Sequence, residues 1–221
     1  MENHVRQNSM KPLADCKLYT FIDTAYLHGR PPEIVAQQLC DGGSDLIQLR
    51  AKKSSPEEIR AMTEKILPIT KRANVGLVIN DYLEIACDLG AELCHLGQED
   101  FFDAGFKNVS ELKTQNPKLK IGLSTHAPAQ AQRAIEADAD YVAIGPIFAT
   151  GTKPTAKPVT LDYVRWANEN VKIPWFAIGG INLKNVDEVL TAGAKRICVV
   201  SAILNSPDVA KACVEFRKRL E

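Results

Sequence analysis

The 221-residue sequence has no excess of charge of either sign, because 27 lysine and arginine side chains balance 27 aspartate and glutamate side chains. A neutral protein has no overall field that draws nucleic acid or an anionic membrane to it. No apolar run approaches the roughly 20 residues of a membrane-spanning helix, and the first residues lack the apolar centre of a secretory signal. We therefore expect a cytoplasmic protein without nucleic-acid or membrane partners, in which any anion site is built locally.

Cysteine pairs at the spacing of metal or redox motifs are also missing. The chain contains no CxxC sequence, and most of its cysteines sit among apolar neighbours, which indicates buried thiols. A redox or metal role is the alternative, and a thiol titration would reveal it. The six cysteines are Cys16, Cys40, Cys87, Cys94, Cys198 and Cys213.

The remaining composition is that of an ordinary folded domain, with 45% hydrophobic and 24% charged residues. A chain of this length fits one domain with one core. Short runs of β-branched and apolar residues recur along it and predict strands, and segments with helical periodicity, such as Ile34, Val35 and Leu39, separate them. The runs are KLYTFID, DLIQLRA, GLVIND, ELCHLG, KIGLST, DYVAIG, PWFAIGG and RICVVS.

The alternation of strand and helix favours a closed ring. Four helix ends, each a glycine or alanine followed by a polar residue, recur roughly fifty residues apart and lead into every second strand. We predict one α/β domain, a single (β/α)8 TIM barrel at residues 14–221, after a flexible N-terminal tail at residues 1–13. A doubly wound open sheet is the alternative, but no GxGxxG turn follows the first strand, and eight βα units suit a closed barrel better.

Two segments carry helix-start signals. Ser55-Pro56-Glu57-Glu58 combines an N-cap serine, a proline at the first helical position and a glutamate placed for a capping box. Ser206-Pro207-Asp208 repeats part of this signal near the C-terminus.

Polar side chains follow the predicted strands one after another. In a (β/α)8 barrel the loops after the strands meet at one face, where reactive groups gather. Glycines after the seventh strand let the backbone approach a ligand, and helix N-termini at this face suit a phosphate. The residues are Gln48, Arg50, Lys52, Asn80, Asp81, His95, Gln98, Glu99, Asp100, Ser124, Thr125, His126, the loop 145–153, Gly179, Gly180, Ile181, Asn182, Val200 and Ser201.

Charges of both signs meet at this predicted mouth. Arg50, Lys52 and Lys153 come from two loops and create a local positive field that suits a diphosphate. Asp81 and Asp100 follow neighbouring strands, and paired carboxylates suit a hard cation that keeps waters and binds substrate phosphates. The sequence therefore predicts an enzyme that uses Mg²⁺ on small phosphorylated substrates.

These groups also have simpler structural interpretations. Asp81 and Asp100 precede helical segments and are compatible with helix N-caps, and Arg50 and Lys52 are compatible with solvated charges or ion pairs. The convergence of every cluster on one rim favours a site, because unrelated structural roles would not collect on one face. The role of His126 stays open between phosphate orientation, acid or base action and helix initiation.

With these motifs the chain resembles the thiamin phosphate synthases from about Lys17 to Leu204. The resemblance implies a (β/α)8 barrel that joins 4-amino-2-methyl-5-hydroxymethylpyrimidine diphosphate to a thiazole phosphate and releases diphosphate. Relatives often have a larger residue at the position of Gly151, so this loop departs from the pattern. The matching stretches are QLRAK at 48–52, ND at 80–81, HLGQED at 95–100, STH at 124–126, GPIFATGTK at 145–153, AIGGI at 177–181 and VVSAI at 199–203.

The resemblance also implies roles for particular residues. It implies Asp81 and Asp100 as Mg²⁺ ligands, and Arg50, Lys52 and Lys153 as catalytic groups that neutralise charge on the leaving diphosphate. The pyrimidine diphosphate contacts it implies are Gln48, Leu49, Arg50, Ala51, Lys52, Asn80, Ser124 and Lys153. The implied thiazole phosphate contacts are Thr150, Gly151, Thr152, Gly180, Val200 and Ser201.

Two other functions stay open. The thiazole tautomerases look like a sister family of barrels and share a histidine at the position of His126. They generally lack the residues of the diphosphate site that are present here, which are Arg50, Lys52, Asn80, Asp81 and Asp100. A barrel that binds a phosphorylated metabolite without turnover is the second alternative, and the intact pair of Asp81 and Asp100 argues against it. The sequence does not reveal whether the thiazole is carboxylated, nor the oligomeric state, since apolar residues on outer helices suit either a homo-oligomer contact or packing on the barrel.

Overall fold

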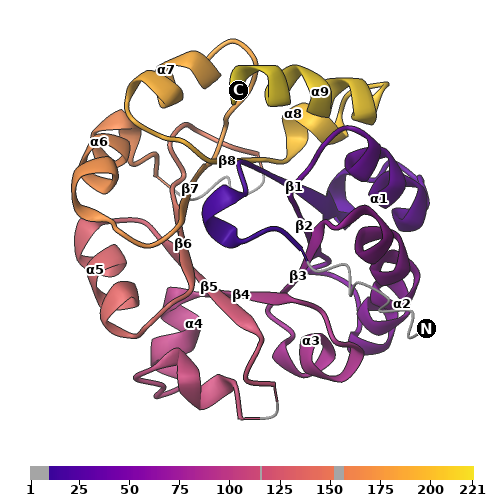
Figure 1. The fold of residues 1–221 in the computed structure, drawn as a ribbon, viewed down its shortest axis with the longest axis horizontal. Helices are drawn as coiled ribbons and strands as arrows, with labels where there is room; N and C mark the ends of the chain where they lie inside the picture. The colour runs from indigo at the N-terminus through magenta and orange to yellow at the C-terminus, as the bar shows by residue number, and fades with distance from the viewer. Residues whose placement is uncertain (1–9, 115, 152–156) are drawn as a thin grey trace, which may run out of the picture.

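The computed structural model describes residues 10–114, 116–151 and 157–221. Within these ranges, parallel strands β1 to β8 close into a barrel, each paired with the next and β8 paired with β1 (Figure 1). The predicted (β/α)8 barrel is confirmed, and the open-sheet alternative is wrong. The strands are β1 Leu18–Asp23, β2 Leu46–Arg50, β3 Gly76–Asn80, β4 Leu93–Gly97, β5 Lys120–Thr125, β6 Tyr141–Ile144, β7 Trp175–Ile178 and β8 Ile197–Val199.

Helices connect successive strands and surround the barrel as an outer ring (Figure 1). Most of them are amphipathic and bury one face against the strands: in α1, Val35 and Leu39 are buried, whereas Ile34 is 54% exposed. The α-helices are α1 Pro32–Asp41, α2 Pro56–Ala73, α3 Leu83–Leu89, α4 Gln98–Asp103, α5 Pro128–Glu136, α6 Thr160–Asn170, α7 Val186–Thr191, α8 Ser201–Leu204 and α9 Val209–Arg219. The 3-10 turns are η1 Leu13–Asp15, η2 Thr24–Tyr26 and η3 Val109–Leu112.

The two predicted helix starts behave differently. At α2 the capping box is present: the Glu58 amide donates to Ser55 Oγ at 3.3 Å, and the Ser55 amide donates to the Glu58 carboxylate at 2.8 Å. At α9 the cap is Asp208, whose carboxylate accepts from the Lys211 amide at 2.9 Å. Ser206 Oγ accepts from the Asp208 amide at 3.2 Å, so this serine orders the turn before the helix.

Side chains alternate along each strand between the barrel interior and the helix layer. The interior contains a cluster of aromatic rings, Tyr19, Phe21, Tyr141 and Phe176, with centroids 5.3 to 6.1 Å apart. The Tyr141 ring occupies space beside Gly122, where an added β-carbon would lie 2.0 Å from a ring carbon. A glycine in β5 is therefore what lets this large ring lie across the barrel.

The N-terminal segment covers one end of the barrel. Met10 and Leu13 pack on the interior cluster, and η1 crosses the centre of the ring in Figure 1. Lys11 Nζ and Arg217 Nη1 of α9 each donate to the Asp45 carboxylate at 2.5 Å. Residues 10–13 of the predicted tail therefore contact the barrel, whereas residues 1–9 of that tail lie outside the described residues.

None of the cysteines is paired, and burial raises the pKa of the Cys16, Cys40 and Cys213 thiols to about 12. The prediction of buried thiols is confirmed for four, Cys16, Cys94, Cys198 and Cys213, whereas Cys40 and Cys87 are partly exposed. No helix within the described ranges is long and apolar enough to cross a membrane.

Candidate active site

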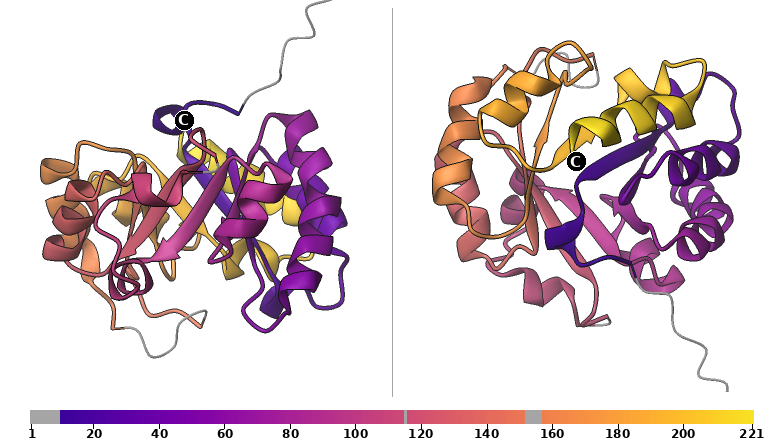
Figure 2. Two further views of the ribbon diagram at one scale, coloured as in Figure 1. Left: turned by 90° about the horizontal axis from the view of Figure 1, so that it is seen from below. Right: turned by 45° about the horizontal axis from the view of Figure 1, so that its top comes forward.

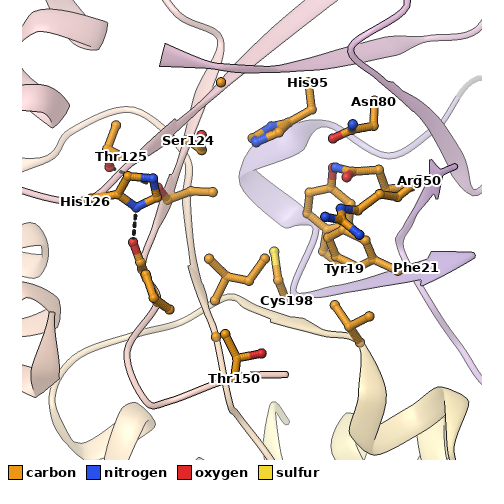
Figure 3. A pocket seen from close by; sticks show the side chains of 18 of the residues that line it. Tyr19, Phe21, Arg50, Asn80, His95, Ser124, Thr125, His126, Thr150 and Cys198 are labelled. Carbon is orange, nitrogen blue, oxygen red and sulfur yellow. Dashed lines mark hydrogen bonds between the residues drawn. The ribbon is translucent and has the colours of Figure 1, made fainter. Parts of the chain in front are cut away.

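A cavity of about 180 Å³ is lined by residues at the carboxyl ends of the strands and in the loops after them. These strand ends lie on the side of the barrel opposite the N-terminal segment (Figure 2). Every strand or the loop after it contributes to its wall. Figure 3 shows Arg50 and Asn80 on one side of this cavity and Ser124, Thr125 and His126 on another. The lining residues are Tyr19, Phe21, Gln48, Arg50, Lys52, Asn80, Asp81, His95, Gly97, Glu99, Asp100, Ser124, Thr125, His126, Ala143, Gly145, Pro146, Thr150, Ile178, Gly179, Gly180, Ile181, Cys198, Val200 and Ser201.

Most residues predicted for the site therefore meet in one cavity, as the position of each at a strand end implied. Thr152 and Lys153 lie outside the described residues, so the predicted third cation is not placed. Gly151 is described but does not line the cavity. A β-carbon added to it would lie 3.3 Å from Tyr26 Oη, so a larger residue here would displace the Tyr26 hydroxyl or the loop.

Leu49 and Ala51, which the resemblance also implies as pyrimidine diphosphate contacts, have side chains that do not line the cavity. Both belong to the apolar core between the barrel and its helices, and both are at most 5% exposed. The reason is the two-residue period of a strand, which turns Gln48 and Arg50 inward and the residue between them outward.

Arg50 is held by a buried acid from the neighbouring strand. Arg50 Nη1 donates to Asp23 Oδ2 at 2.7 Å, and the Asp23 side chain is only 2% exposed. The other carboxylate oxygen, Oδ1, accepts from the Ala25 amide at 3.0 Å and caps η2. The register that places Asp23 beside Arg50 on β1 and β2 thus orients the guanidinium at the cavity wall.

Lys52, Asn80 and Asp81 form a second charged group at the mouth. Lys52 Nζ lies 2.5 Å from Asp81 Oδ2, and the Asn80 amide nitrogen donates to the same oxygen at 2.6 Å. Asp81 has a φ of 68°, in the left-handed region that few residues other than glycine adopt. Its amide donates to the His95 carbonyl at 2.9 Å, which ties the turn to β4.

The two acidic residues are not helix caps. No side chain caps α3 or α4; Asp81 precedes α3 by two residues, and Asp100 lies in the first turn of α4. A β-carbon on Gly97 would lie 2.5 Å from Asp100 Oδ2, so the carboxylate lies over this glycine. The capping interpretation is therefore wrong for both, and both carboxylates line the cavity.

The cavity floor contains a row of buried hydrogen bonds. Gln48 Nε2 donates to Tyr19 Oη at 2.5 Å, Tyr19 Oη lies 3.2 Å from Tyr141 Oη, and Tyr141 Oη lies 3.1 Å from His95 Nδ1. Burial raises the pKa of both phenols well above the ordinary value of 10.0. Both hydroxyls therefore keep their hydrogens at neutral pH and can act as donors.

His126 is oriented by the loop after β6. Its Nδ1 lies 2.5 Å from the Gly145 carbonyl oxygen, the contact dashed in Figure 3. A carbonyl only accepts, so Nδ1 carries the hydrogen and Nε2 of the neutral ring is the acceptor. The His126 amide donates to Gln130 Oε1 at 2.6 Å, within the first turn of α5.

Backbone at the ends of β7 and β8 forms the remaining wall. Gly180 has a φ of 66°, and an added β-carbon would lie 2.6 Å from the Ala149 carbonyl oxygen. Asn182 and Asn185 donate to the Gly180 carbonyl at 3.2 and 3.0 Å. Only glycine lets the loops after β6 and β7 approach this closely, beside Val200 and Ser201.

Sequence reasoning missed several of these groups. Asp23 was identifiable as a charged residue at the end of an otherwise apolar strand, LYTFID. Tyr19 and Tyr141 gave no signal, since buried aromatic residues in strands are usually core residues. Gly97 belongs to the predicted strand ELCHLG and to the matching stretch HLGQED, but neither pattern indicates that it provides the space for the Asp100 carboxylate.

Comparison with known proteins places these features together in one family. The sequence profile described as thiamine monophosphate synthase matches residues 18–203. The chain is 44% identical over 180 residues to the thiamine-phosphate synthase of Thermus thermophilus, covering 81% of this chain and 84% of the relative. It is 38% identical to that of Lawsonia intracellularis, over 93% of each. Among solved structures, thiamine phosphate pyrophosphorylase from Pyrococcus furiosus aligns with a TM-score of 0.81 and 31% identity, covering 93% of this chain and 95% of that one.

Proposed function

The chain belongs to the thiamine monophosphate synthase family, and from this premise we propose how its cavity joins the two phosphorylated substrates. The protein is a transferase that condenses 4-amino-2-methyl-5-hydroxymethylpyrimidine diphosphate with thiazole phosphate and forms thiamin phosphate and diphosphate. The observation that carries this assignment to the site is the meeting of Arg50, Lys52, Asp81 and Asp100 in one cavity. Cations and carboxylates at one mouth suit a diphosphate that arrives with a metal ion.

We place the pyrimidine diphosphate along β2 and β3. Along the inner side of β2 and the turn after it, Gln48 is buried, Arg50 is partly exposed and Lys52 is exposed, so charge increases from the floor to the mouth. The diphosphate would lie against Arg50, Lys52 and Asn80, and the ring would reach Gln48. Ser124 faces the same cavity from β5.

We propose Asp81 and Asp100 as the Mg²⁺ ligands. Their chemistry fits, since Mg²⁺ is commonly held by one or two carboxylates, with water and substrate phosphates in its other positions. In the part of the chain that the structure describes, no group of three or more His, Cys, Asp or Glu residues is placed to hold a metal. The bound ion would neutralise charge on the leaving diphosphate. Lys52, which pairs with Asp81 here, would move to the phosphate when the substrate binds.

We place the thiazole phosphate at the ends of β6, β7 and β8. Gly180, Val200 and Ser201 line the cavity there together with Thr150, and backbone at such barrel ends commonly holds a phosphate. The two sites face each other across one cavity, so the thiazole nitrogen would lie in line with the departing diphosphate. The protein's task is to position two substrates and stabilise the charge that develops, with no covalent intermediate.

The test is product formation by the purified protein. The pyrimidine diphosphate and thiazole phosphate are mixed with the protein in Mg²⁺, with and without a chelator, and thiamin phosphate and diphosphate are both quantified. We expect equal amounts of the two products, and none with the chelator. Binding of the substrates without product in Mg²⁺ would instead favour a barrel that binds but does not turn over.

Two substitutions test the assignment of residues. Asp81→Ala and Arg50→Ala are each expected to lower kcat/KM at least a hundredfold, since both act on the diphosphate. The matched control is Arg60→Ala, which removes an exposed arginine paired with Asp88 at 2.6 Å away from the cavity. Activity near the wild-type level in Asp81→Ala or Arg50→Ala would show that the diphosphate lies elsewhere.

A further inference from the structure

The buried row of Gln48, Tyr19, Tyr141 and His95 connects four strands, β2, β1, β6 and β4. Gln48 is 2% exposed, Tyr19 is 1% exposed and Tyr141 is fully buried. The contacts are 2.5 Å from Gln48 Nε2 to Tyr19 Oη, 3.2 Å between the two hydroxyls and 3.1 Å from Tyr141 Oη to His95 Nδ1. Buried polar groups at these distances are held in one arrangement, because an unpaired donor or acceptor is costly there.

The hydrogen bonds of this row all run in one direction, from Gln48 toward His95. The Gln48 amide nitrogen donates to Tyr19 Oη, which leaves the Tyr19 hydroxyl hydrogen for Tyr141 Oη. The Tyr141 hydroxyl hydrogen is then available to His95 Nδ1. Each phenol accepts once and donates once, so neither hydroxyl hydrogen is left unpaired in the floor. With its nitrogen turned to Tyr19, the Gln48 amide has its carbonyl oxygen on the other side.

Gln48 is also where a substrate ring would lie. It faces the cavity one inward position below Arg50, whose guanidinium marks the level of the diphosphate. The rings of Tyr19 and Phe21 stack with centroids 5.3 Å apart beside it, and both line the cavity. A planar ring whose diphosphate lies at the mouth would therefore contact the rings of Tyr19 and Phe21 and the side-chain amide of Gln48.

We propose that Tyr19 and Tyr141 are positioning residues that hold the Gln48 carbonyl toward the cavity, so that the floor accepts a hydrogen bond from an amino group on the substrate ring. This inference rests on the proposed function for the identity of the ring. In this role the two tyrosines make the site prefer a pyrimidine with an amino group over one with an oxo group at the same carbon. They do so without any charged contact. An oxo oxygen would face the Gln48 oxygen, and two acceptors cannot pair.

The test compares two ligands by calorimetry in Mg²⁺, which needs no turnover. They are the 4-aminopyrimidine diphosphate and its 4-oxo analogue. The wild-type protein is expected to bind the amino compound at least about tenfold more tightly. Tyr19→Phe frees the amide to rotate, so this ratio should fall to about threefold or less. Tyr141→Phe should lower it similarly, because the Tyr19 hydroxyl can then donate to Gln48 Oε1 and turn the amide over.

Tyr141→Phe is the decisive variant, since Tyr141 does not contact Gln48 in the row. Both substitutions keep the aromatic ring and its packing on Phe176. The control is Tyr163→Phe, which removes another buried hydroxyl, bonded to Thr125 Oγ1 at 2.8 Å and not connected to Gln48. It is expected to keep the wild-type ratio.

The outcomes separate this inference from the proposed function. A wild-type protein that binds both ligands equally or prefers the oxo analogue would overturn the inference, as would an unchanged ratio in Tyr141→Phe. If the ratios behave as expected but no thiamin phosphate forms, the proposed function fails and the positioning role stands. If thiamin phosphate forms but Tyr19→Phe and Tyr141→Phe keep the wild-type ratio of the two affinities, the proposed function stands and the positioning role fails.

Discussion

At the scale of single residues, some side chains orient the cavity wall without lining the cavity themselves. Asp23 is one of them, since its buried carboxylate orients Arg50. We expect Asp23→Ala to raise the KM for the pyrimidine diphosphate roughly tenfold, because Arg50 then samples positions away from the diphosphate. Steady-state kinetics measure this. Asp88→Ala, which frees the exposed Arg60, is the matched control and should leave KM unchanged; equal effects of the two changes would contradict a positioning role.

Gly97 is a second residue that shapes the site, because its missing side chain leaves space for the Asp100 carboxylate. In Gly97→Ala the new β-carbon would lie 2.5 Å from Asp100 Oδ2, so the carboxylate has to move. The Gly97 backbone, with φ of −62° and ψ of 134°, suits alanine, so the fold should keep its stability. We expect the Mg²⁺ concentration for half-maximal velocity to rise roughly tenfold. An unchanged Mg²⁺ requirement with a native melting temperature would argue against Asp100 as a ligand.

At the scale of elements, α9 begins differently from α2, although a Ser-Pro sequence lies at or just before the start of both helices. Asp208 accepts from the Lys211 amide at 2.9 Å and caps the helix, whereas Ser206 bonds only within the preceding turn. Asp208→Ala should lower the free energy of unfolding by about 1 kcal/mol, and Asp208→Asn should retain most of it, because both side chains cap well. Urea denaturation measures the difference. A larger loss in Ser206→Ala than in Asp208→Ala would assign the cap to the serine.

At the scale of the whole molecule, Asp45 joins the two ends of the chain. It accepts from Lys11, from the backbone amides that open β1, and from Arg217 of α9. Burial acts to raise its pKa, but the Lys11 ammonium, these amides and Arg217 outweigh it, so the pKa lies below the ordinary 3.8. An acid with a lowered folded pKa stabilises the fold above its unfolded pKa, and this is lost as pH falls through the folded value.

We therefore expect Asp45→Asn to lower the free energy of unfolding at neutral pH by about 3 kcal/mol, because it leaves cations without their buried partner. The difference from the wild type should begin to narrow below about pH 4, the unfolded pKa of an aspartate, and should narrow further as the pH falls through the lower folded pKa of Asp45. Urea denaturation across this range measures both curves. Asp162→Asn, at an exposed pair with Arg165, should follow the wild type at every pH, and a constant offset for Asp45→Asn would contradict the role of its charge.

The sequence by itself determined the barrel and the rim on which the site lies. Apolar periodicity and strand length are local properties, so strands such as LYTFID and GLVIN were readable without any partner strand. A closed parallel barrel then places all strand ends on one face, so residues as distant as Arg50 and Ser201 were predictable neighbours. The two-residue period of a strand also predicts that the side chains of Gln48 and Arg50 face the barrel interior and that the Leu49 side chain faces the helices.

The tertiary structure decided what the local pattern does not carry. Whether Asp81 and Asp100 cap helices depends on carboxylate positions set by the turn at Asp81 and the space over Gly97. The pairing of Asp23 with Arg50 depends on strand register, and the row from Gln48 to His95 depends on Tyr141 crossing the barrel beside Gly122. These contacts join residues up to 122 positions apart, and hydrogen bonds need atoms within about 3 Å, a distance that only the closed barrel sets.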